Sequence, residues 1–276
     1  VNARISEHSY PRYRLARALL GRVLAGVDLF CVRDRDSFER LAGLGAPSSR
    51  THLTGELKFD VLAGGGLAAT TEDLLGPLMA GQPTVVAAST REGEEELVLE
   101  AFSCVLATGR ALRLVLAPRH AERSGEVARL AAQLGLSVLL WTQAREAHPA
   151  DRSAWEVLVV DSVGELRGFM KSALGVFVGG TLVPVGGHNL LEPAAFALPV
   201  AAGPYLANVA YQAGPLRDNQ ALASVEDAEA LSRVWLDWLD RPEAAQAAGQ
   251  RALEVVERGR GALARTLAAL EPYLPR

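Results

Sequence analysis

The chain has few cysteines, and their positions exclude two common uses of that residue. Cys31 and Cys104 are the 2 cysteines among 276 residues. They lie far apart in the sequence, and neither belongs to a CxxC motif. The sequence therefore indicates neither a disulfide framework nor a zinc knuckle, and a reducing compartment fits it best.

Long apolar runs and an excess of basic residues are also missing. No uninterrupted apolar run approaches the roughly 18 to 20 residues of a membrane-spanning helix, and no signal segment opens the chain. Asp and Glu number 32 against 28 Lys and Arg, which gives a formal net charge of −4. Because nucleic-acid-binding proteins usually carry a clear basic excess, we expect no nucleic-acid partner. With 49% hydrophobic and 22% charged residues, the composition predicts a folded globular protein.

The sequence lacks the motifs of several large enzyme classes. It contains no GxxxxGK[ST], HExxH or GxSxG, so no motif supports a P-loop protein, a zincin metalloprotease or a hydrolase with a nucleophile elbow. The 5 histidines are scattered without metal-ligand spacing, and we expect neither a metal nor another cofactor. The GxGxxG dinucleotide fingerprint is missing too, so a bound nucleotide would favour a glycosyltransferase over a dehydrogenase.

Short runs of β-branched residues or leucine alternate with longer helical patterns, as is typical of βαβ units on a parallel sheet. The expected strands are 28–32, 84–88, 112–116, 136–140, 157–160, 175–178 and 198–202. The expected helices are 12–25, 36–43, 93–108, 120–134, 164–173, 189–197, 226–239 and about 242–270. Several strands are too apolar to have a wet face, which predicts helices on both sides of the sheet. The regular alternation starts after Pro83 and predicts a domain boundary near residue 80.

A basic amphipathic pattern lies near the start of the chain, between Pro11 and Leu24. Arginines alternate there with leucines and a valine. We favour a core-packing helix with a solvated basic face. The alternative is a helix that lies on an anionic membrane surface.

Polar and glycine-rich residues follow the ends of four expected strands. These segments are 89–93, 117–120, 161–165 and 179–189. Ligands of open parallel sheets bind outside the carboxyl ends of the strands, so the four segments predict a binding edge. The glycine pairs in 179–187 permit close approach of a ligand, although a structural turn also explains them.

The last of these segments predicts a phosphate site. Asn189 is a good N-cap for an expected helix over Leu190–Ala197, and a helix start favours a phosphate. Glu192, in its first turn, has the geometry to accept two hydrogen bonds from a ribose diol. Arg119 follows a strand, and its fixed fork suits a phosphate or a base carbonyl.

Several of these residues also have purely structural interpretations. Arg119 has the position of a surface arginine beside a turn proline, and Glu165 that of an acid that stabilises a helix dipole. His188 alone is more often structural than catalytic. For the run Glu94–Glu96 we favour helix-dipole stabilisation with a solvated face.

Five segments carry a resemblance to a known family. They are VNARISEHSYPRYR at 1–14, TGELKFD at 54–60, AASTREGEEE at 87–96, PRHAER at 118–123 and FVGGTLVPVGGHNLLEPAAF at 177–196. In this order they resemble the 3-deoxy-D-manno-octulosonic acid (Kdo) transferases of lipopolysaccharide synthesis, along the whole chain. The resemblance implies an α/β fold of GT-B type with two Rossmann-like domains that face a cleft. It also implies transfer of Kdo from CMP-Kdo to a lipid A precursor, with inversion at the anomeric carbon.

The resemblance assigns a role to each half of the chain. Residues 1–80 would be the end of a partial N-terminal acceptor domain and a linker, and residues 81–276 a complete C-terminal donor domain. The implied location is the cytoplasmic face of the inner membrane, where the protein is peripheral or anchored by a missing N-terminal part. The family's general base, a glutamate, precedes the segment that matches VNAR. We therefore expect that this chain alone lacks the base.

The resemblance also implies the site residues. Lys58 falls where the family places a basic residue that stabilises charge in the transition state. Pro118 and Arg119 look like its cytidine-binding pair, and Val163, Gly164 and Glu165 like its Met-Gly-Glu contact to CMP. The helix that holds phosphate and ribose matches Asn189, Leu190, Leu191 and Glu192, and the predicted donor site further includes Gly186, Gly187 and His188.

The chain departs from the family pattern at a few of these positions. Glu56 stands where the family usually has Asn, Arg91 where it has His, and Ser162-Val163 where it has Thr-Met. Glu56 adds a negative charge beside Lys58, which weakens the proposed electrostatic role. Two other hypotheses therefore stay open: a GT-B enzyme with another donor such as a UDP-sugar, and a non-catalytic nucleotide-binding or assembly module.

Overall fold

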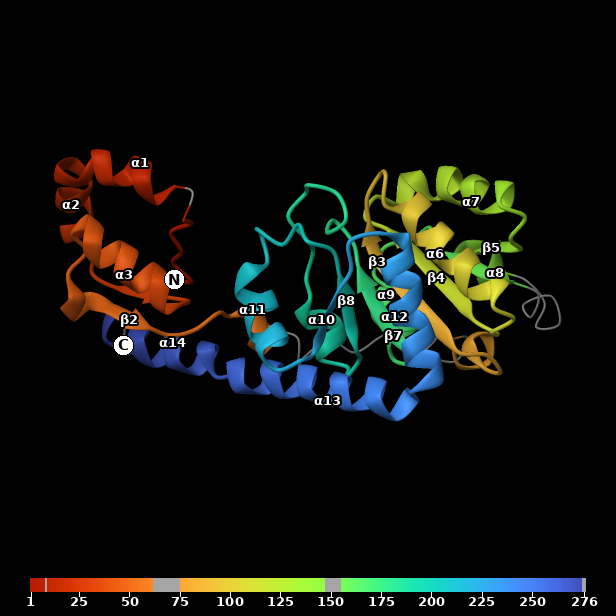
Figure 1. Cartoon of the computed structure of the whole chain (residues 1–276). Coiled ribbons are helices and arrows are strands. Elements are labelled where there is room, and N and C mark those ends of the chain that lie inside the picture. Colours follow the sequence, from red (N-terminus) through yellow and green to blue (C-terminus); the bar gives the residue numbers. More distant parts are fainter. Residues whose placement is uncertain (8, 62–74, 147–154, 275–276) are drawn as a thin grey trace. The chain divides into compact units, whose positions relative to one another are not determined.

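The computed structural model describes residues 1–7, 9–61, 75–146 and 155–274. The chain divides into two compact units (Figure 1), of which the first comprises Val1–Gly65 with Val256–Arg276 and the second Gly66–Val255. The first unit is therefore discontinuous in sequence.

The first unit is built on two parallel strands, β1 (Phe30–Val32) and β2 (Thr51–Leu53). Its helices are α1 (Tyr10–Leu15), α2 (Arg17–Ala25), α3 (Arg35–Leu44), α4 (Lys58–Val61) and α14 (Ala262–Leu270). Short 3₁₀ helices are η1 (Ser48–Arg50) and η4 (Glu271–Tyr273). Helix α3 begins where the Asp34 carboxylate accepts a hydrogen bond from the Ser37 N–H at 2.6 Å, and it ends at Gly45 with φ 104°.

The C-terminal helix α14 is bonded to the segment that carries α4. The Asp60 carboxylate accepts hydrogen bonds from the backbone N–H groups of Gly261 at 2.7 Å and Leu263 at 2.6 Å. Arg265 Nε donates to the carbonyl oxygen of Thr54 at 2.8 Å. These bonds explain why the units differ from the sequence-based division near residue 80, which assigned residues 256–276 to the second domain. Because the carboxylate that accepts these helix-capping hydrogen bonds belongs to a residue distant in sequence, no local sequence pattern predicts them.

The second unit contains a doubly wound sheet of seven parallel strands in the order β5-β6-β4-β3-β7-β8-β9. The strands are β3 (Thr84–Thr90), β4 (Arg113–Pro118), β5 (Val138–Leu140), β6 (Val157–Val159), β7 (Gly175–Val178), β8 (Val200–Ala202) and β9 (Leu222–Ser224). The predicted fold class, a parallel α/β sheet, is confirmed. Strand β3 lies between β4 and β7, so strands β4, β5 and β6 lie on one side of it and strands β7, β8 and β9 on the other.

Helices connect these strands. They are α6 (Glu95–Ala107), η2 (Ala121–Arg123), α7 (Ser124–Gln133), α8 (Trp141–Glu146), α9 (Leu166–Met170), α10 (Leu191–Ala194), α11 (Ala210–Asp218), α12 (Ala228–Asp240) and α13 (Pro242–Gly259). The helix expected over 242–270 is broken between α13 and α14, at Gly261 with φ 89°. Sequence analysis missed α11 because Gly214 and Pro215 inside it are typical of a turn.

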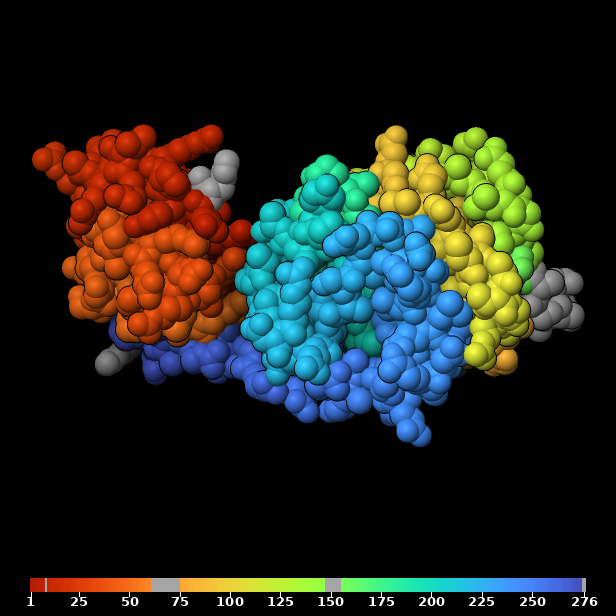
Figure 2. Space-filling model, in the orientation of Figure 1, coloured from red at the N-terminus to blue at the C-terminus, as the bar shows by residue number. Residues whose placement is uncertain are grey.

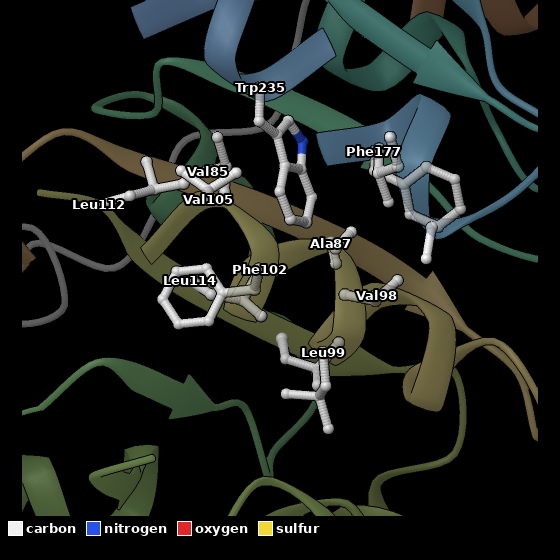
Figure 3. Close-up of a cluster of buried hydrophobic side chains, with 14 of the residues drawn as sticks. Val85, Ala87, Val98, Leu99, Phe102, Val105, Leu112, Leu114, Phe177 and Trp235 are labelled. Carbon is white, nitrogen blue, oxygen red and sulfur yellow. The ribbon is translucent and has the colours of Figure 1, made fainter. Parts of the chain in front are cut away.

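The core of the second unit forms where α6 and α12 pack together over the sheet. Figure 3 shows Val98, Leu99 and Phe102 of α6 in one cluster with strand residues such as Val85 and Ala87 and with Trp235 of α12. Phe102 and Trp235 are both fully buried. The strands in the middle of the sheet, such as Val157–Val159, are also buried throughout, as the apolar runs predicted.

Candidate functional site

The candidate site forms at the carboxyl ends of β3, β4 and β7. These three strands are neighbours in the sheet, and β3 is the point at which the winding direction reverses. In open α/β sheets, ligands bind in the crevice outside such a switch point. The segment after β3, the segment after β4 and the long 179–190 loop after β7 therefore meet at one edge.

A single buried carboxylate joins two of these segments. Glu94, which is 0% exposed, accepts hydrogen bonds through Oε2 from the backbone N–H groups of Arg91 at 2.9 Å and Gly180 at 2.6 Å. Its Oε1 accepts from the N–H groups of Thr181 at 2.8 Å and Leu182 at 2.7 Å. One charge thus satisfies four backbone donors and fixes the start of the β7 loop against the β3 loop.

The backbone is unusually close-packed at this junction. A Cβ atom on Gly179 would lie 2.5 Å from Cα of Thr90, so only glycine fits there. Ser89, at the end of β3, has φ 57° although it is not a glycine, and the β3–β4 register shifts between Ala88 and Thr90. Strained non-glycine residues cluster at functional sites.

Four basic side chains gather above this junction. Arg91 Nε donates to His188 Nε2 at 3.1 Å, and Arg91 Nη1 lies 2.8 Å from His120 Nε2. Burial, followed by the positive charges of Arg91, Arg119 and His120, lowers the pKa of His188 from 6.5 to about 4. His188 is therefore neutral at physiological pH, with Nε2 as the acceptor of the Arg91 bond.

This arrangement suits an anionic ligand. Arg91 and Arg119 bring two permanent positive charges to the edge, and after burial their repulsion of a further positive charge contributes to the low pKa of His188. A phosphate placed among these groups would relieve that repulsion and accept bidentate hydrogen bonds. We name Arg91, Arg119, His120 and His188 the basic cluster.

Pro118 and Arg119 lie at the end of β4. Pro118 is buried as the last residue of the strand, and Arg119 is exposed. The backbone N–H of Arg119 donates to the carbonyl oxygen of Thr90 at 2.9 Å, which holds this turn against the end of β3. The structure therefore brings Arg119 together with the other basic residues, and its contact to cytidine stays a prediction.

Val163, Gly164 and Glu165 follow β6, which is separated from β3 by β4. Val163 is 91% exposed, and Gly164 has φ 104°. The Glu165 carboxylate accepts hydrogen bonds from the Ser162 hydroxyl and from Arg145 Nη1, the latter at 3.1 Å. Its surroundings are polar, and its contact to CMP stays a prediction.

The segment from Gly186 to Glu192 differs in part from expectation. The helix predicted over Leu190–Ala197 is shorter, because α10 spans Leu191–Ala194 only. The N-cap residue of α10 is Leu190, so the prediction that Asn189 caps this helix is wrong. Asn189 Oδ1 accepts from the Leu191 N–H at 3.3 Å from the position before the cap, and the Leu190 N–H donates to Gln212 Oε1 at 2.8 Å. Because these donors are engaged and both leucine side chains are buried, the pair shapes the loop by packing. Gly187, with φ 89°, is one of the turn positions that require glycine.

Glu192 remains partly accessible beside this loop. Burial raises the pKa of its carboxyl, and the positive charge of Arg167 partly opposes the shift. Arg167 Nε lies 3.9 Å from Glu192 Oε1. The predicted hydrogen bonds from Glu192 to two ribose hydroxyls stay a prediction.

Lys58 lies in the first unit, at the start of α4, and its side chain is exposed. The neighbouring Glu56 is buried and pairs with Arg33 Nη1 at 3.3 Å. Glu56 also accepts from Asn2 Nδ2 at 3.1 Å and from the Lys58 backbone N–H at 3.3 Å. Because Arg33 also pairs with Asp34 at 2.7 Å, it offsets only part of the negative charge beside Lys58. The catalytic role of Lys58 stays a prediction.

Sequence analysis was wrong about the glutamates of α6. Glu94 and Glu95 are both 0% exposed, where a solvated face was expected. Glu95 binds Arg123 Nη1 at 2.9 Å, and burial raises the pKa of its carboxyl. Glu94 is the N-cap residue of α6, and its carboxylate reaches back to the Arg91 N–H, a contact that no capping-box pattern in the sequence marks. No sequence signal marks Gln212, whose partner is 22 residues away.

Comparisons with known proteins agree on one family. Residues 1–61 match a family model described as 3-deoxy-D-manno-octulosonic-acid transferase (kdotransferase). The chain is 34% identical over 276 residues to a protein named 3-deoxy-D-manno-octulosonic acid transferase of Haemophilus influenzae, which covers 100% of this chain and 64% of that protein. The chain thus spans somewhat less than two thirds of this relative.

Two solved structures are similar to the chain. The C-terminal CMP-Kdo binding domain of WaaA from Acinetobacter baumannii is 30% identical with TM-score 0.62, and the match covers 68% of this chain and 99% of that domain. A UDP-GlcNAc 2-epimerase from Neisseria meningitidis has TM-score 0.60 at 12% identity, over 99% of this chain and 68% of that one. The second likeness concerns the fold alone. Together they agree with the expected GT-B type of α/β fold.

Replacing Glu94 by glutamine should strongly destabilise the second unit. The amide nitrogen cannot accept, so two buried backbone N–H groups lose their partner, and we expect unfolding to become easier by about 3 kcal/mol or more. The matched control is Glu96→Gln, because Glu96 is exposed on the same helix, with an effect within about 0.5 kcal/mol. Denaturant unfolding of both variants measures the difference, and equal midpoints would contradict the role given to Glu94.

His188 should titrate near pH 4 in an NMR pH titration of its ring. Arg91→Gln removes one positive neighbour and should raise this pKa, whereas Arg129→Gln, an exposed arginine on α7, should not change it. The unfolded chain binds this proton near pH 6.5, so the contribution of His188 to stability is full above about pH 6.5 and decreases as the pH falls toward 4. A His188 midpoint near 6.5 in the unmodified chain would refute the neutral assignment.

Proposed function

Because the chain belongs to the 3-deoxy-D-manno-octulosonic acid transferase family, we propose that it binds CMP-Kdo as the donor half of an inverting glycosyltransferase. The acceptor in this proposal is a lipid A precursor. The observation that carries the donor assignment is the basic cluster at the switch point of the sheet. The likeness to a domain named for CMP-Kdo binding supports it.

The charge of the donor matches the basic cluster. CMP-Kdo carries two anionic groups, the phosphodiester and the carboxylate of the sugar. Arg91 supplies a guanidinium whose fork suits either group, and Arg119 adds a second positive charge beside it. Neutral His188 stays hydrogen-bonded to Arg91 and orients that guanidinium. The departure from the family at position 91 replaces a titratable side chain by a permanent charge.

The reaction that fits these residues is departure of CMP from the anomeric carbon. Negative charge grows on the phosphate as the glycosidic bond breaks, and the guanidiniums of the cluster would stabilise it more in the transition state than in the ground state. A single phosphate needs no obligatory metal. Lys58 is assigned a similar role in stabilising developing charge, on the basis of the resemblance.

Recognition of the nucleoside is assigned to residues around the cluster. In this proposal Arg119, beside Pro118, contacts the cytosine ring, and Glu192 accepts hydrogen bonds from the ribose hydroxyls. Glu165 contributes a further polar contact from the β6 loop. The charged partners Arg145 and Arg167 keep these two carboxylates oriented before the nucleotide arrives.

Calorimetric titration with CMP and UMP tests the donor assignment. We expect saturable binding of CMP, with UMP at least about tenfold weaker, which is about 1.4 kcal/mol. Arg119→Ala and Glu192→Ala should each reduce the CMP affinity by about 1–3 kcal/mol, because each removes a charged hydrogen bond. Arg129→Ala is the control and should leave the affinity unchanged.

Other outcomes of this titration favour the rival hypotheses. Equal binding of CMP and UMP would favour a GT-B enzyme with another donor, such as a UDP-sugar. Binding of CMP without turnover, when the chain is joined to the upstream part of a family member, would favour a non-catalytic module. No binding of either nucleotide would overturn the donor site in this chain.

We further propose that the chain contacts the cytoplasmic face of the inner membrane through α1 and α2. These helices contain no fully buried residue, and the core packing predicted for this segment is limited to the partly buried Leu24, which packs against the core of the first unit. Leu15, Leu19 and Val23 are 93%, 68% and 60% exposed. Exposed arginines flank them: Arg12, Arg14, Arg17 and Arg22. Apolar anchors flanked by basic residues suit an anionic lipid surface. No helix in the described part of the chain has the length and apolar character to span a bilayer.

Vesicle sedimentation tests this membrane contact. The chain should bind vesicles that contain anionic phospholipid and should bind neutral vesicles weakly, with about 1 kcal/mol from each arginine near the surface. The double variant Leu15→Glu/Leu19→Glu should lose most of the binding. Leu134→Glu, at an exposed leucine of the second unit, is the matched control and should retain it. Equal binding by both variants would refute the proposal.

A further inference from the structure

A second recess in the sheet unit lies away from the candidate donor site. It has a volume of about 440 Å³ and is bordered by α11, by the end of α12 and by α13. Pro199 and Ala221, which directly precede β8 and β9, form part of its wall. All strands of the sheet are parallel, so the recess lies at the amino edge, opposite the loops of the basic cluster. Figure 2 shows this hollow between the cyan atoms of α11 and the blue atoms of α12 and α13.

Three arginines from three different segments line this recess, with one carboxylate. Arg217 comes from the end of α11, Arg241 from the α12–α13 junction and Arg251 from α13, and the carboxylate is that of Asp237. The lining therefore carries an excess of positive charge. This is a clear departure from a chain whose formal net charge is −4.

The bonds of these arginines leave donors for a ligand. Arg251 Nε and Nη2 donate to the carbonyl oxygens of Asn219 at 2.9 Å and Gln220 at 2.8 Å, which fixes its guanidinium. Arg241 Nε donates to Asp237 Oδ1 at 2.6 Å, and its Nη2 bonds the same oxygen. Within the residues that the structure describes, Arg217 has no side-chain partner. At least one nitrogen of each guanidinium thus remains available.

Close packing holds together the elements beneath the recess. A Cβ atom on Gly249 would lie 1.9 Å from the carbonyl oxygen of Ala197, so α13 packs directly on the turn before β8. Trp238 is 5% exposed, and its ring covers Gly175, where a Cβ would lie 2.4 Å from it. Small alanines of α13, among them Ala245 and Ala248, leave the space above this floor open. The recess is therefore formed before any ligand binds, as most small-molecule sites are.

We propose that this recess is a second binding site, for a small molecule that carries a phosphate group. Three guanidiniums that approach from separate segments suit the three terminal oxygens of a tetrahedral phosphate better than a planar carboxylate. The volume lies within the usual range for small-ligand sites. The proposal stands apart from the proposed function, because its residues are on the opposite edge of the sheet.

Helix α11 gives this second site a physical connection to the donor loop. Arg217 is in the last turn of the helix, and Gln212 in its first turn binds the Leu190 N–H of the 179–190 loop. Gln212 is 0% exposed and also donates to the Tyr211 hydroxyl at 2.7 Å. A ligand that binds Arg217 therefore contacts the same helix, α11, whose Gln212 is hydrogen-bonded to the 179–190 loop.

An NMR titration with inorganic pyrophosphate tests the site, because it separates the two edges of the sheet. In the unmodified chain, up to about 10 mM pyrophosphate should shift the amide signals of Ala221 and Ala223 and the indole signal of Trp238. In the double variant Arg217→Gln/Arg241→Gln, the affinity for pyrophosphate obtained from these shifts should be at least about tenfold lower. The amide signals of Gly180 and Gly187, in the donor loop, report on pyrophosphate bound at the other edge of the sheet. These signals should respond in the double variant as they do in the unmodified chain.

The matched control removes two charges elsewhere. Arg129→Gln/Arg233→Gln, at two exposed helix positions of the same unit, should leave the affinity of the recess unchanged. Ala248→Phe fills the recess without a change of charge and should also weaken the Ala221 and Ala223 shifts. Absence of these shifts in the unmodified chain, or equal affinity in the two arginine double variants, would overturn the proposal.

Discussion

The candidate site depends on the buried carboxylate of Glu94. Its oxygens accept four backbone hydrogen bonds from two loops that leave neighbouring strands, and those loops would otherwise carry unpaired buried donors. The negative charge lies beneath the loops, while Arg91 and Arg119 lie above them. The two guanidiniums are thus positioned to attract an anion. The carboxylate of Glu94 is buried, and backbone N–H groups already occupy its oxygens. The residue that shapes the site is thus unable to compete for its ligand.

The substitution of arginine for histidine at position 91 fits this electrostatic arrangement. Arg91 keeps its charge at any physiological pH, and it lowers the pKa of the neighbouring His188. The pair then consists of the charged Arg91 guanidinium and the neutral His188 ring, which accepts a hydrogen bond from it. Arg91 therefore brings to the site a positive charge that does not depend on pH over the neutral range.

Sequence patterns predicted the sheet well and the side-chain partners poorly. The apolar runs located β3, β4, β6 and β7 because their residues are buried on both faces. They missed β9, whose three residues are partly or fully exposed, and α11, which contains a proline. The basic cluster was predictable only in part, since strand ends are visible in a sequence while the Arg91–His188 contact spans 97 positions. The family resemblance supplied the site residues that periodicity does not mark.

The bonds between Asp60 and the start of α14 impose an order on the synthesis of this protein. Asp60 and Gly261 are 201 residues apart in sequence, so these bonds form only after Leu263 has left the ribosome. The second unit lies between these two positions and has its residues available earlier. The contact between α4 and α14 is therefore made late in synthesis, when all residues of the seven-stranded sheet are already available.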